Sequence, residues 1–319
     1  MSTSTTQKPT VVITGATGLL GRAVVKAFEA HQTYQVIGTG WTRAKEPIQA
    51  LNLLSTQEVD QALERWAPRV VVHCAAEKRP DKAQEDPEGA ETLNALVSGQ
   101  LARKCAQMGA FFVYISTDYV FDGENPPYMP DDQTNPLNLY GQSKRGGELQ
   151  VMEAQGNSVC LRVPILYGEA EDPADSAVNI LAHRVQERRD HPSEEVSPLE
   201  MDDEAVRFPT YTGDVARAIL EITDQALVGH SLPHTMHFSA QESFTKYDMC
   251  LIFADILEVS HKQIKACKPI PGPATGTNRP RNAALAITQT RDAGISCQTV
   301  DFRSWWTAYL TQPTSTTKQ

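Results

Sequence analysis

The sequence lacks an excess of basic residues, a long apolar run and an apolar segment at its start. Its net charge is −10, which argues against a surface for nucleic acid or anionic membranes, because both select basic patches. No apolar run approaches the roughly 18 residues of a membrane-spanning helix. The polar start MSTSTTQKP has no signal-peptide core. We therefore expect a cytoplasmic chain with no membrane segment. An additional nuclear pool is the alternative.

Cysteine is also sparse, and no two cysteines form a C-x-x-C pair. Six cysteines are scattered along the 319 residues, and Cys74 and Cys160 lie inside apolar runs. Such spacing favours buried free thiols in a reducing compartment over disulfides or metal ligands. We therefore predict no metal site.

What the sequence does contain is a glycine-spaced turn close to its start. An apolar run at 11–13 is followed by Gly15, Gly18 and Gly21, and then by apolar residues at helical spacing. This order predicts a strand, a tight turn and a helix. Glycines in such a turn let backbone approach a pyrophosphate, and the helix N-terminus offers it free N–H groups. A purely structural turn is the alternative, but the context favours dinucleotide binding.

Strands and helices alternate through the first half of the chain. Apolar runs at 34–39, 69–75 and 110–116 predict further strands, with helices at 56–66 and 87–108. This alternation predicts the α/β class: a doubly wound parallel Rossmann sheet with its ligand at the carboxyl ends of the strands. The expected organisation is a disordered tail at 1–9, a nucleotide-binding domain at 10–163, a smaller α/β substrate or partner lobe at 164–311 that returns to the sheet in places, and a disordered tail at 312–319.

The second half of the chain is less regular. The stretch 190–205 is rich in acidic residues and is expected to be a mobile surface loop, either solvated or contacting a basic partner. The proline- and glycine-rich stretch 268–277 is a second expected loop. Thr245 is a plausible N-cap for a helix. The remaining predicted elements are strands at 159–163 and 234–238 and helices at 176–189, 212–227, 245–257 and from 302 onward.

The end of the second predicted strand distinguishes the two nicotinamide dinucleotides. An NAD site usually has an acid there for the ribose 2′-hydroxyl, but no acidic residue lies between Glu29 and Glu46. Arg43, with Arg22 and Lys45 as further cations, could hold a 2′-phosphate instead. The prediction is NADP(H), and solvated loop cations are the alternative.

The ends of the other predicted strands add candidate site residues. Asn52 and Leu53 are expected to pass the adenine side of the cofactor. Ala75 and Ala76, after the third strand, are small enough for a ligand to approach. His73, inside that apolar strand, is expected to be a hydrogen-bonded core residue rather than a catalytic one.

A second pattern carries the chemistry of a reductase. The fourth strand ends at Ser116 and Thr117, and Tyr140 and Lys144 share one face of a predicted helix at i and i+4. A lysine ammonium beside a phenol lowers the phenol pKa from about 10, so the tyrosine can exchange a proton nearer neutral pH. The lysine can also hold the nicotinamide ribose, and a hydroxyl from Thr117 or Ser116 would polarise a substrate carbonyl.

Together, the glycine turn, Ser116-Thr117, Tyr140 and Lys144 resemble the extended short-chain dehydrogenase/reductases. Within them, the segments 116–123 (STDYVFDG) and 136–141 (PLNLYG) resemble the dTDP-4-dehydrorhamnose reductase branch. Sugar-nucleotide dehydratases of this superfamily carry an Asp-Glu pair where this chain has Asp118-Tyr119, which argues against dehydration. The resemblance implies an NADPH-dependent ketoreductase acting on a sugar nucleotide, with Thr117, Tyr140 and Lys144 as its catalytic residues.

The chain also resembles the regulatory beta subunits of methionine adenosyltransferase. The matching segments span nearly the whole chain: 14–24, 72–81, 162–169, 207–209, 245–249 and 279–283. The reductases lack an Arg-Pro at the position of Arg79-Pro80, so that segment separates the two branches best. The resemblance implies a partner, the catalytic subunit that makes S-adenosylmethionine. It also implies NADP binding by Thr17, Gly18, Leu19, Leu20, Trp41, Thr42, Arg43, Asn52, Leu53, Cys74, Lys78, Tyr140 and Leu166.

Three functions are therefore carried forward. The first is an NADP-binding regulatory subunit whose reductase site is vestigial, the second is an active reductase, and the third is a redox sensor that reports NADPH through a partner. One departure concerns docking: animal beta subunits end in an aromatic and basic tail, whereas this chain has Trp305-Trp306 and then the polar end TQPTSTTKQ. We expect the two tryptophans to pack on the last helix.

Overall fold

The computed structural model describes residues 8–190, 197–268 and 277–312. Most of the two predicted tails, at 1–7 and 313–319, lies outside the described residues. The same holds for 191–196 in the predicted acidic loop and for 269–276 in the predicted proline-rich loop.

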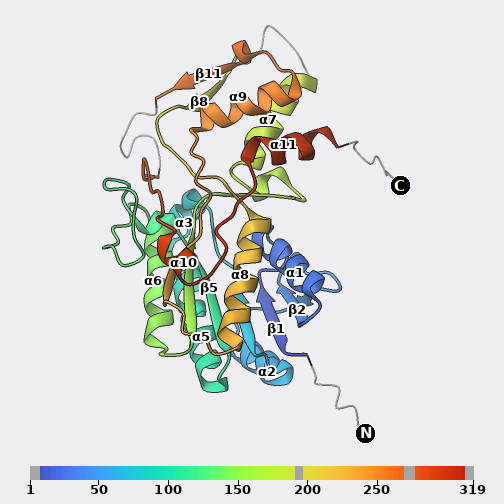
Figure 1. The fold of residues 1–319 in the computed structure, drawn as a ribbon, viewed down its shortest axis with the longest axis vertical. Helices are drawn as coiled ribbons and strands as arrows, with labels where there is room; N and C mark the ends of the chain where they lie inside the picture. Colours follow the sequence, from blue (N-terminus) through green and yellow to red (C-terminus); the bar gives the residue numbers. More distant parts are fainter. Residues whose placement is uncertain (1–7, 191–196, 269–276, 313–319) are drawn as a thin grey trace.

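A seven-stranded parallel sheet forms the lower half of the molecule (Figure 1). Its strand order is β10-β6-β5-β4-β1-β2-β3, and every neighbouring pair is parallel. The predicted α/β class and doubly wound sheet are confirmed. The strands are β1 (Thr10–Thr14), β2 (Gln35–Gly40), β3 (Gln49–Ala50), β4 (Val70–His73), β5 (Phe111–Thr117), β6 (Ser158–Val163) and β10 (Thr235–His237).

Helices cover both faces of the sheet because each central strand is apolar on both sides. In β1, Val11 and Ile13 pack in one cluster with α1 (Leu19–His31) and α8 (Thr212–Leu227). Val12 points the other way, into a cluster with α2 (Thr56–Trp66) and α5 (Val97–Met108). The alternation of side chains along a strand thus builds two separate cores from one run of residues.

The predicted helix at 87–108 is present but interrupted. It consists of α4 (Pro87–Glu91), a π-helical turn η1 (Thr92–Leu96) and α5. The short α3 (Pro80–Glu85) precedes it. The 3-10 turn η2 (Asp118–Val120) follows β5, and α6 (Leu139–Glu153) begins at Asn138, whose side chain accepts a hydrogen bond from Gly141 N at 2.9 Å.

The chain leaves the sheet after β6 and later returns to it. β10 pairs with β6, α8 packs beside α1, and α10 (Thr288–Asp292) contacts β10. Residues 212–237 therefore belong spatially with the first half of the chain. The division at residue 163 stays a prediction.

The second lobe lies above the carboxyl ends of the strands (Figure 1). Tyr167, Val185, Phe253, Phe302 and Trp306 lie at the centre of its apolar core. Its elements are β7 (Leu166–Tyr167) paired with β9 (Thr210–Tyr211), β8 (Leu199–Asp202) paired with β11 (Ile264–Cys267), the 3-10 turns η3 (Pro173–Asp175) and η4 (His261–Gln263), and the helices α7 (Asn179–Asp190), α9 (Lys246–Leu257) and α11 (Phe302–Thr311).

Two features of this lobe test the sequence predictions directly. The expectation of a loop throughout 190–205 is wrong at 199–202, where β8 forms, because Leu199 and Met201 alternate with acidic residues and pack toward α9. Thr245 caps α9 as predicted, in a capping box with Asp248. Among the described residues, none of the helices is both long and apolar enough to cross a membrane.

Candidate dinucleotide site and reductase triad

The turn between β1 and α1 requires glycine at two of its three glycine positions. Gly15 has a φ of +68°, and a Cβ there would lie 2.6 Å from the backbone nitrogen of Ala75. A Cβ on Gly21 would lie 2.1 Å from the carbonyl oxygen of Gly15. The turn is therefore pressed against the end of β4 on one side and against its own helix on the other.

Gly18 is less constrained than the other two glycines. A Cβ there would meet one atom, the Gly15 carbonyl oxygen at 3.2 Å. Gly18 is the N-cap of α1; among the described residues no side chain caps this helix, and its first turn holds no acid. Leu19 and Leu20 are buried, so only their backbone is available at this end. An uncapped helix start beside a glycine fits a pyrophosphate.

The residues that follow β2 and β3 lie at the same edge of the sheet. Thr17 lies close to Gly40, at the end of β2, and Leu51 N donates to the Gly40 carbonyl at 2.8 Å. This places Asn52 and Leu53 beside the segment that holds Trp41, Thr42 and Arg43. Trp41 is 57% exposed, and its ring is available to a ligand.

The predicted 2′-phosphate cations already share an anion within the chain. Asp175, in η3, accepts from Arg43 Nη1 at 3.0 Å and from Arg22 Nη2 at 3.1 Å. Arg22 also donates to the Thr17 carbonyl at 2.6 Å, so both of its terminal nitrogens are engaged. The Lys78 ammonium donates to the Asp175 carbonyl oxygen. Arg43 keeps half of its side chain exposed and is the better placed phosphate ligand.

The end of β4 contributes Cys74, Ala75 and Ala76, as predicted from its small residues. Cys74 N donates to the Thr14 carbonyl at 3.2 Å, which ties this segment to β1. His73 is a hydrogen-bonded core residue, as expected: its Nδ1 lies 2.6 Å from the Thr14 hydroxyl, and burial lowers its pKa to about 3.

The predicted catalytic hydroxyls separate into one that faces the site and one that does not. Thr117 lies at the end of β5, and its hydroxyl lies near the Tyr140 phenol and acts to lower the phenol pKa. Its hydroxyl also contacts the carboxylate of Asp118 at 3.0 Å, and burial raises the pKa of that carboxyl to about 7. Ser116 points away and donates to Glu148 at 2.6 Å. Thr117 alone can therefore polarise a carbonyl here.

The effect of Lys144 on the pKa of Tyr140 stays a prediction, because no hydrogen bond between the two side chains is found among the described residues. The Lys144 ammonium lies 4.0 Å from the centre of the Tyr114 ring, over its face. Burial lowers the pKa of Lys144 to about 7. Burial, with Asp118 and Tyr119 nearby, raises the pKa of Tyr140 above its usual value. Spacing at i and i+4 placed both side chains on one helix face, but a cation–π contact with Tyr114 directs the ammonium elsewhere.

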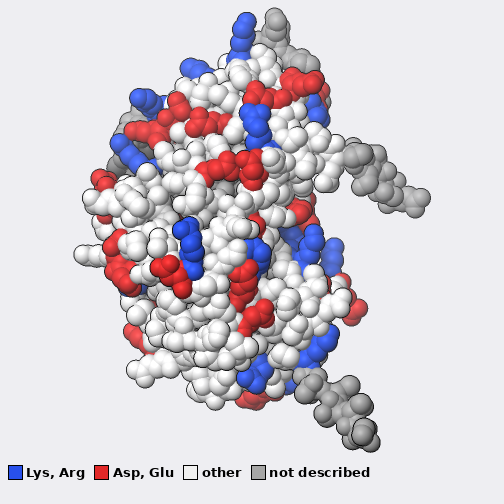
Figure 2. All heavy atoms as spheres, in the orientation of Figure 1, with Lys and Arg blue, Asp and Glu red and all other residues white. Residues whose placement is uncertain are grey.

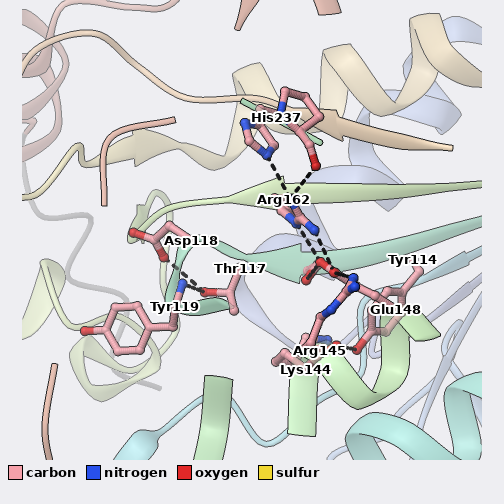
Figure 3. Close-up of polar contacts among 11 residues, drawn as sticks. Tyr114, Thr117, Asp118, Tyr119, Lys144, Arg145, Glu148, Arg162 and His237 are labelled. Carbon is pink, nitrogen blue, oxygen red and sulfur yellow. Dashed lines mark hydrogen bonds and ion pairs between the residues drawn. The ribbon is translucent and has the colours of Figure 1, made fainter. Parts of the chain in front are cut away.

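A buried ionic network lies behind this face, and sequence reasoning missed it (Figure 3). Glu148, one turn beyond Lys144, receives two hydrogen bonds from Arg162 at 2.7 and 2.8 Å. Arg162 also contacts Nε2 of His237 at 3.3 Å and donates to the Pro130 carbonyl at 3.0 Å. The signal was present: an arginine inside the otherwise apolar strand β6 requires a buried partner.

Leu166, the last predicted cofactor residue, lies in β7. Its carbonyl accepts from the Ser176 hydroxyl at 2.8 Å, so the segment that carries Asp175 is tied to the strand that carries Leu166. The predicted cofactor residues thus lie in the turns at the carboxyl edge of the sheet, in the first turns of α1 and α6, or in the segment above the sheet.

Comparison with known proteins gives two sets of relatives. The family model for the RmlD substrate binding domain matches residues 9–313. Methionine adenosyltransferase 2 subunit beta of Bos taurus is 41% identical over 290 residues, which cover 91% of this chain and 84% of that protein. The dTDP-4-dehydrorhamnose reductase of Mycolicibacterium smegmatis is 29% identical over 307 residues, covering 88% and 82%.

Solved structures agree on the fold. A dTDP-4-dehydrorhamnose reductase from Clostridium acetobutylicum matches with a TM-score of 0.79 and 26% identity, over 94% of this chain and 98% of that one. The reductase of Bacillus anthracis, solved in complex with NADP, matches with a TM-score of 0.79 and 23% identity, over 96% and 99%. The Rossmann-like sheet and the lobe above it are therefore an architecture shared with these reductases.

Proposed function

The chain belongs to the family of methionine adenosyltransferase 2 beta subunits, within the larger family of the RmlD substrate binding domain, and we propose that it is an NADP(H)-binding regulatory subunit of methionine adenosyltransferase. In this role it modulates S-adenosylmethionine synthesis by binding the catalytic subunit. The observation that carries the proposal is the 41% identity to a named beta subunit over 91% of the chain, against 29% to a named reductase.

Contacts between family-specific segments support this assignment. Arg279 donates from Nη2 to both carboxylate oxygens of Asp81, at 2.9 and 2.8 Å. These residues belong to the two segments, 79–81 and 279–283, that resemble the beta subunits, and they lie 198 positions apart. The segment that best separates beta subunits from reductases therefore joins the second half of the chain to the first.

The same proposal assigns roles to the site residues. Gly15, Gly18 and Gly21, with the backbone of Thr17, Leu19 and Leu20, hold the pyrophosphate, and Arg43 holds the 2′-phosphate. Trp41, Thr42, Asn52 and Leu53 flank the adenosine. Cys74, Ala75, Ala76, Lys78, Tyr140, Lys144 and Leu166 line the path to the nicotinamide. Because all six cysteines are free, the proposed compartment is the cytoplasm or the nucleus.

Complex formation tests the regulatory role. We expect the purified chain to co-elute with the methionine adenosyltransferase catalytic subunit of its own organism in size-exclusion chromatography and to change the KM or kcat of that enzyme. Separate elution together with unchanged kinetics would contradict the proposal. Basic and acidic side chains are interspersed on the face drawn in Figure 2.

An active reductase is the second candidate function, and the contact between Thr117 and Tyr140 favours it. NADPH bound at the glycine turn would supply the hydride. Thr117 would hold the ketone oxygen of a sugar nucleotide, and Tyr140 would give it a proton. The charges of Arg207 and Arg279 act on the neighbouring Tyr119 phenol, where a diphosphate would be held.

Tyr140→Phe separates the two functions. Under the regulatory proposal, the variant binds the catalytic subunit within about twofold of wild type, because partner binding does not require the phenol to transfer a proton. If the chain is a reductase, wild type oxidises NADPH with a 4-keto sugar nucleotide and the variant is slower by about 10²–10⁴-fold. Tyr119→Phe is the comparison variant, because its ring packs edge-on against Tyr140 at 5.7 Å. Since its phenol lies at the proposed diphosphate position, its loss should raise the KM for the sugar nucleotide rather than lower kcat.

A further inference from the structure

Asp175 places a carboxylate from the second lobe at the proposed phosphate site of the first. Its two oxygens each accept from a different arginine, Arg43 at 3.0 Å and Arg22 at 3.1 Å. The Asp175 side chain is 11% exposed, whereas half of the Arg43 side chain is exposed, so the contact is enclosed on the Asp175 side and open on the Arg43 side. Glu171, which approaches Arg22 at 3.6 Å, is 73% exposed.

The Asp175 carboxylate makes the same hydrogen bonds to Arg43 and Arg22 that a bound phosphate would make. An oxyanion held by guanidinium groups on two sides is the usual geometry of phosphate recognition. A 2′-phosphate held by Arg43 would bring a second anion beside the Asp175 carboxylate. Like charges at such a distance repel strongly where water is partly excluded.

We propose that the Asp175 carboxylate occupies the 2′-phosphate subsite on Arg43, so that binding of NADP(H) displaces the segment 171–175 and is transmitted to the C-terminal helix. This inference rests on the proposed cofactor. It identifies which part of the second lobe responds to that cofactor and predicts that NADP(H) displaces this segment while NAD(H), which lacks the 2′-phosphate, does not.

The route to the C-terminal helix runs through a shared cavity and through the start of α7. Pro173, two residues before Asp175, lines a cavity of about 90 Å³ together with Trp306 and Tyr309 of α11. The Ser176 hydroxyl, one residue after Asp175, accepts from the backbone nitrogens of 178 and 179 at the start of α7. Movement of η3 therefore alters both the start of α7 and the packing beneath α11.

Adenosine 2′,5′-bisphosphate tests the proposal, with ADP as the matched ligand that lacks the 2′-phosphate. We expect Asp175→Asn to bind the bisphosphate about tenfold more tightly than wild type in calorimetry, because a like charge beside the phosphate is removed. ADP affinity should change by less than about twofold. Glu171→Gln, the exposed acid of the same segment, should leave both affinities within about twofold.

A tighter complex in Asp175→Asn should also depend on Arg43. The double variant Asp175→Asn with Arg43→Gln is expected to lose the tenfold gain. Hydrogen exchange gives a second readout: in wild type, the bisphosphate should increase amide exchange at 171–176, while ADP should not.

Three results would overturn the inference. Weaker binding of the bisphosphate by Asp175→Asn would mean that the carboxylate positions Arg43 rather than competing for it. An equal gain in affinity for the bisphosphate and for ADP would mean that Asp175 lowers the affinity for any adenine nucleotide, whether or not it carries a 2′-phosphate. Binding of the bisphosphate to neither protein would remove the phosphate subsite itself. Failure to bind the catalytic subunit would leave all of these measurements unaffected.

Discussion

Gly15→Ala is expected to abolish measurable NADP(H) binding and to destabilise the fold by about 2–4 kcal/mol. Two effects add. Alanine is strained at a φ of +68°, and its Cβ would lie 2.6 to 2.9 Å from three backbone atoms of residues 74 and 75. Relief of that clash moves the turn away from β4, and the N–H groups of α1 then no longer point at the pyrophosphate. Isothermal titration with NADP⁺ and urea unfolding measure the two effects.

Gly109→Ala is the matched control for the backbone cost. Gly109 has nearly the same φ, +66°, but a Cβ there meets nothing within 4 Å. We expect this variant to lose about 1 kcal/mol of stability and to keep wild-type affinity for NADP⁺. The difference between the two variants isolates the steric term.

Gly18→Ala keeps the test valid if Gly15→Ala fails to fold. Gly18 has a φ of −85°, which alanine adopts freely, and its Cβ would meet only the Gly15 carbonyl oxygen, at 3.2 Å. The added methyl would lie at the helix N-terminus that is assigned to the pyrophosphate. We expect near-native stability with at least a tenfold loss of NADP⁺ affinity. Wild-type affinity in both turn variants would show that the dinucleotide binds elsewhere.

The turn was predictable because its constraints are local. Strand, glycines and helix follow one another within about 20 residues, and each residue type restricts the backbone directly. The same holds for Thr245, which caps α9 by accepting a hydrogen bond from the backbone nitrogen of Asp248, three residues further along the chain. Local patterns also predicted β10 and α8, whose apolar residues are regularly spaced.

Interactions between distant segments were not predictable in this way. Asp175 accepts a hydrogen bond from Arg22, 153 positions away in sequence. No residue pattern in either segment predicts that the two lie together. Lys144 turns toward Tyr114 because the fold places that ring beneath α6, 30 positions away in sequence. β8 was missed because its acidic residues, Glu200 and Asp202, are typical of a surface loop. The residues that alternate with them, Leu199 and Met201, pack into the core of the second lobe. The pairing of such segments depends on the tertiary fold, which sequence spacing alone does not contain.

Arg162→Met is expected to destabilise the protein by about 3–5 kcal/mol, because it leaves the buried Glu148 carboxylate without its main partner. Both side chains are almost fully buried, at 2% and 1% exposure, and two hydrogen bonds join them. Arg145→Met is the matched control. Arg145 contacts the same carboxylate at 2.7 Å but is 28% exposed, so we expect a loss of about 1 kcal/mol or less.

The double variant Arg162→Met with Glu148→Met should recover most of the lost stability, since it removes both buried charges and keeps the volume. A double-mutant cycle from urea unfolding then gives the coupling energy of the pair. A cycle with no coupling would show that Arg162 acts through its contacts with His237 and Pro130 instead.

The pH dependence of these variants identifies Glu148 as the responsible group. In wild type, burial alone would raise the pKa of Glu148, but Arg162 outweighs this and holds the pKa below the usual 4.5. The stability it contributes is therefore present above pH 4.5 and is lost as the pH falls through the lower, folded-state pKa. In Arg162→Met the sign reverses: burial raises the pKa of Glu148, so the carboxyl takes up a proton on folding.

The stability difference between wild type and Arg162→Met should therefore be largest near pH 7. It should shrink as the pH falls, first through the raised pKa of Glu148 in the variant and then, below 4.5, through its lowered pKa in wild type. Arg145→Met should show little change over the same range. Because Glu148 shares α6 with Tyr140 and holds it against Ser116 of β5, loosening this anchor should also weaken NADP⁺ binding near pH 7. A difference that stays constant from pH 4 to 7 would assign the stabilisation to the packing of the Arg162 side chain, with the Glu148 charge having no part in it.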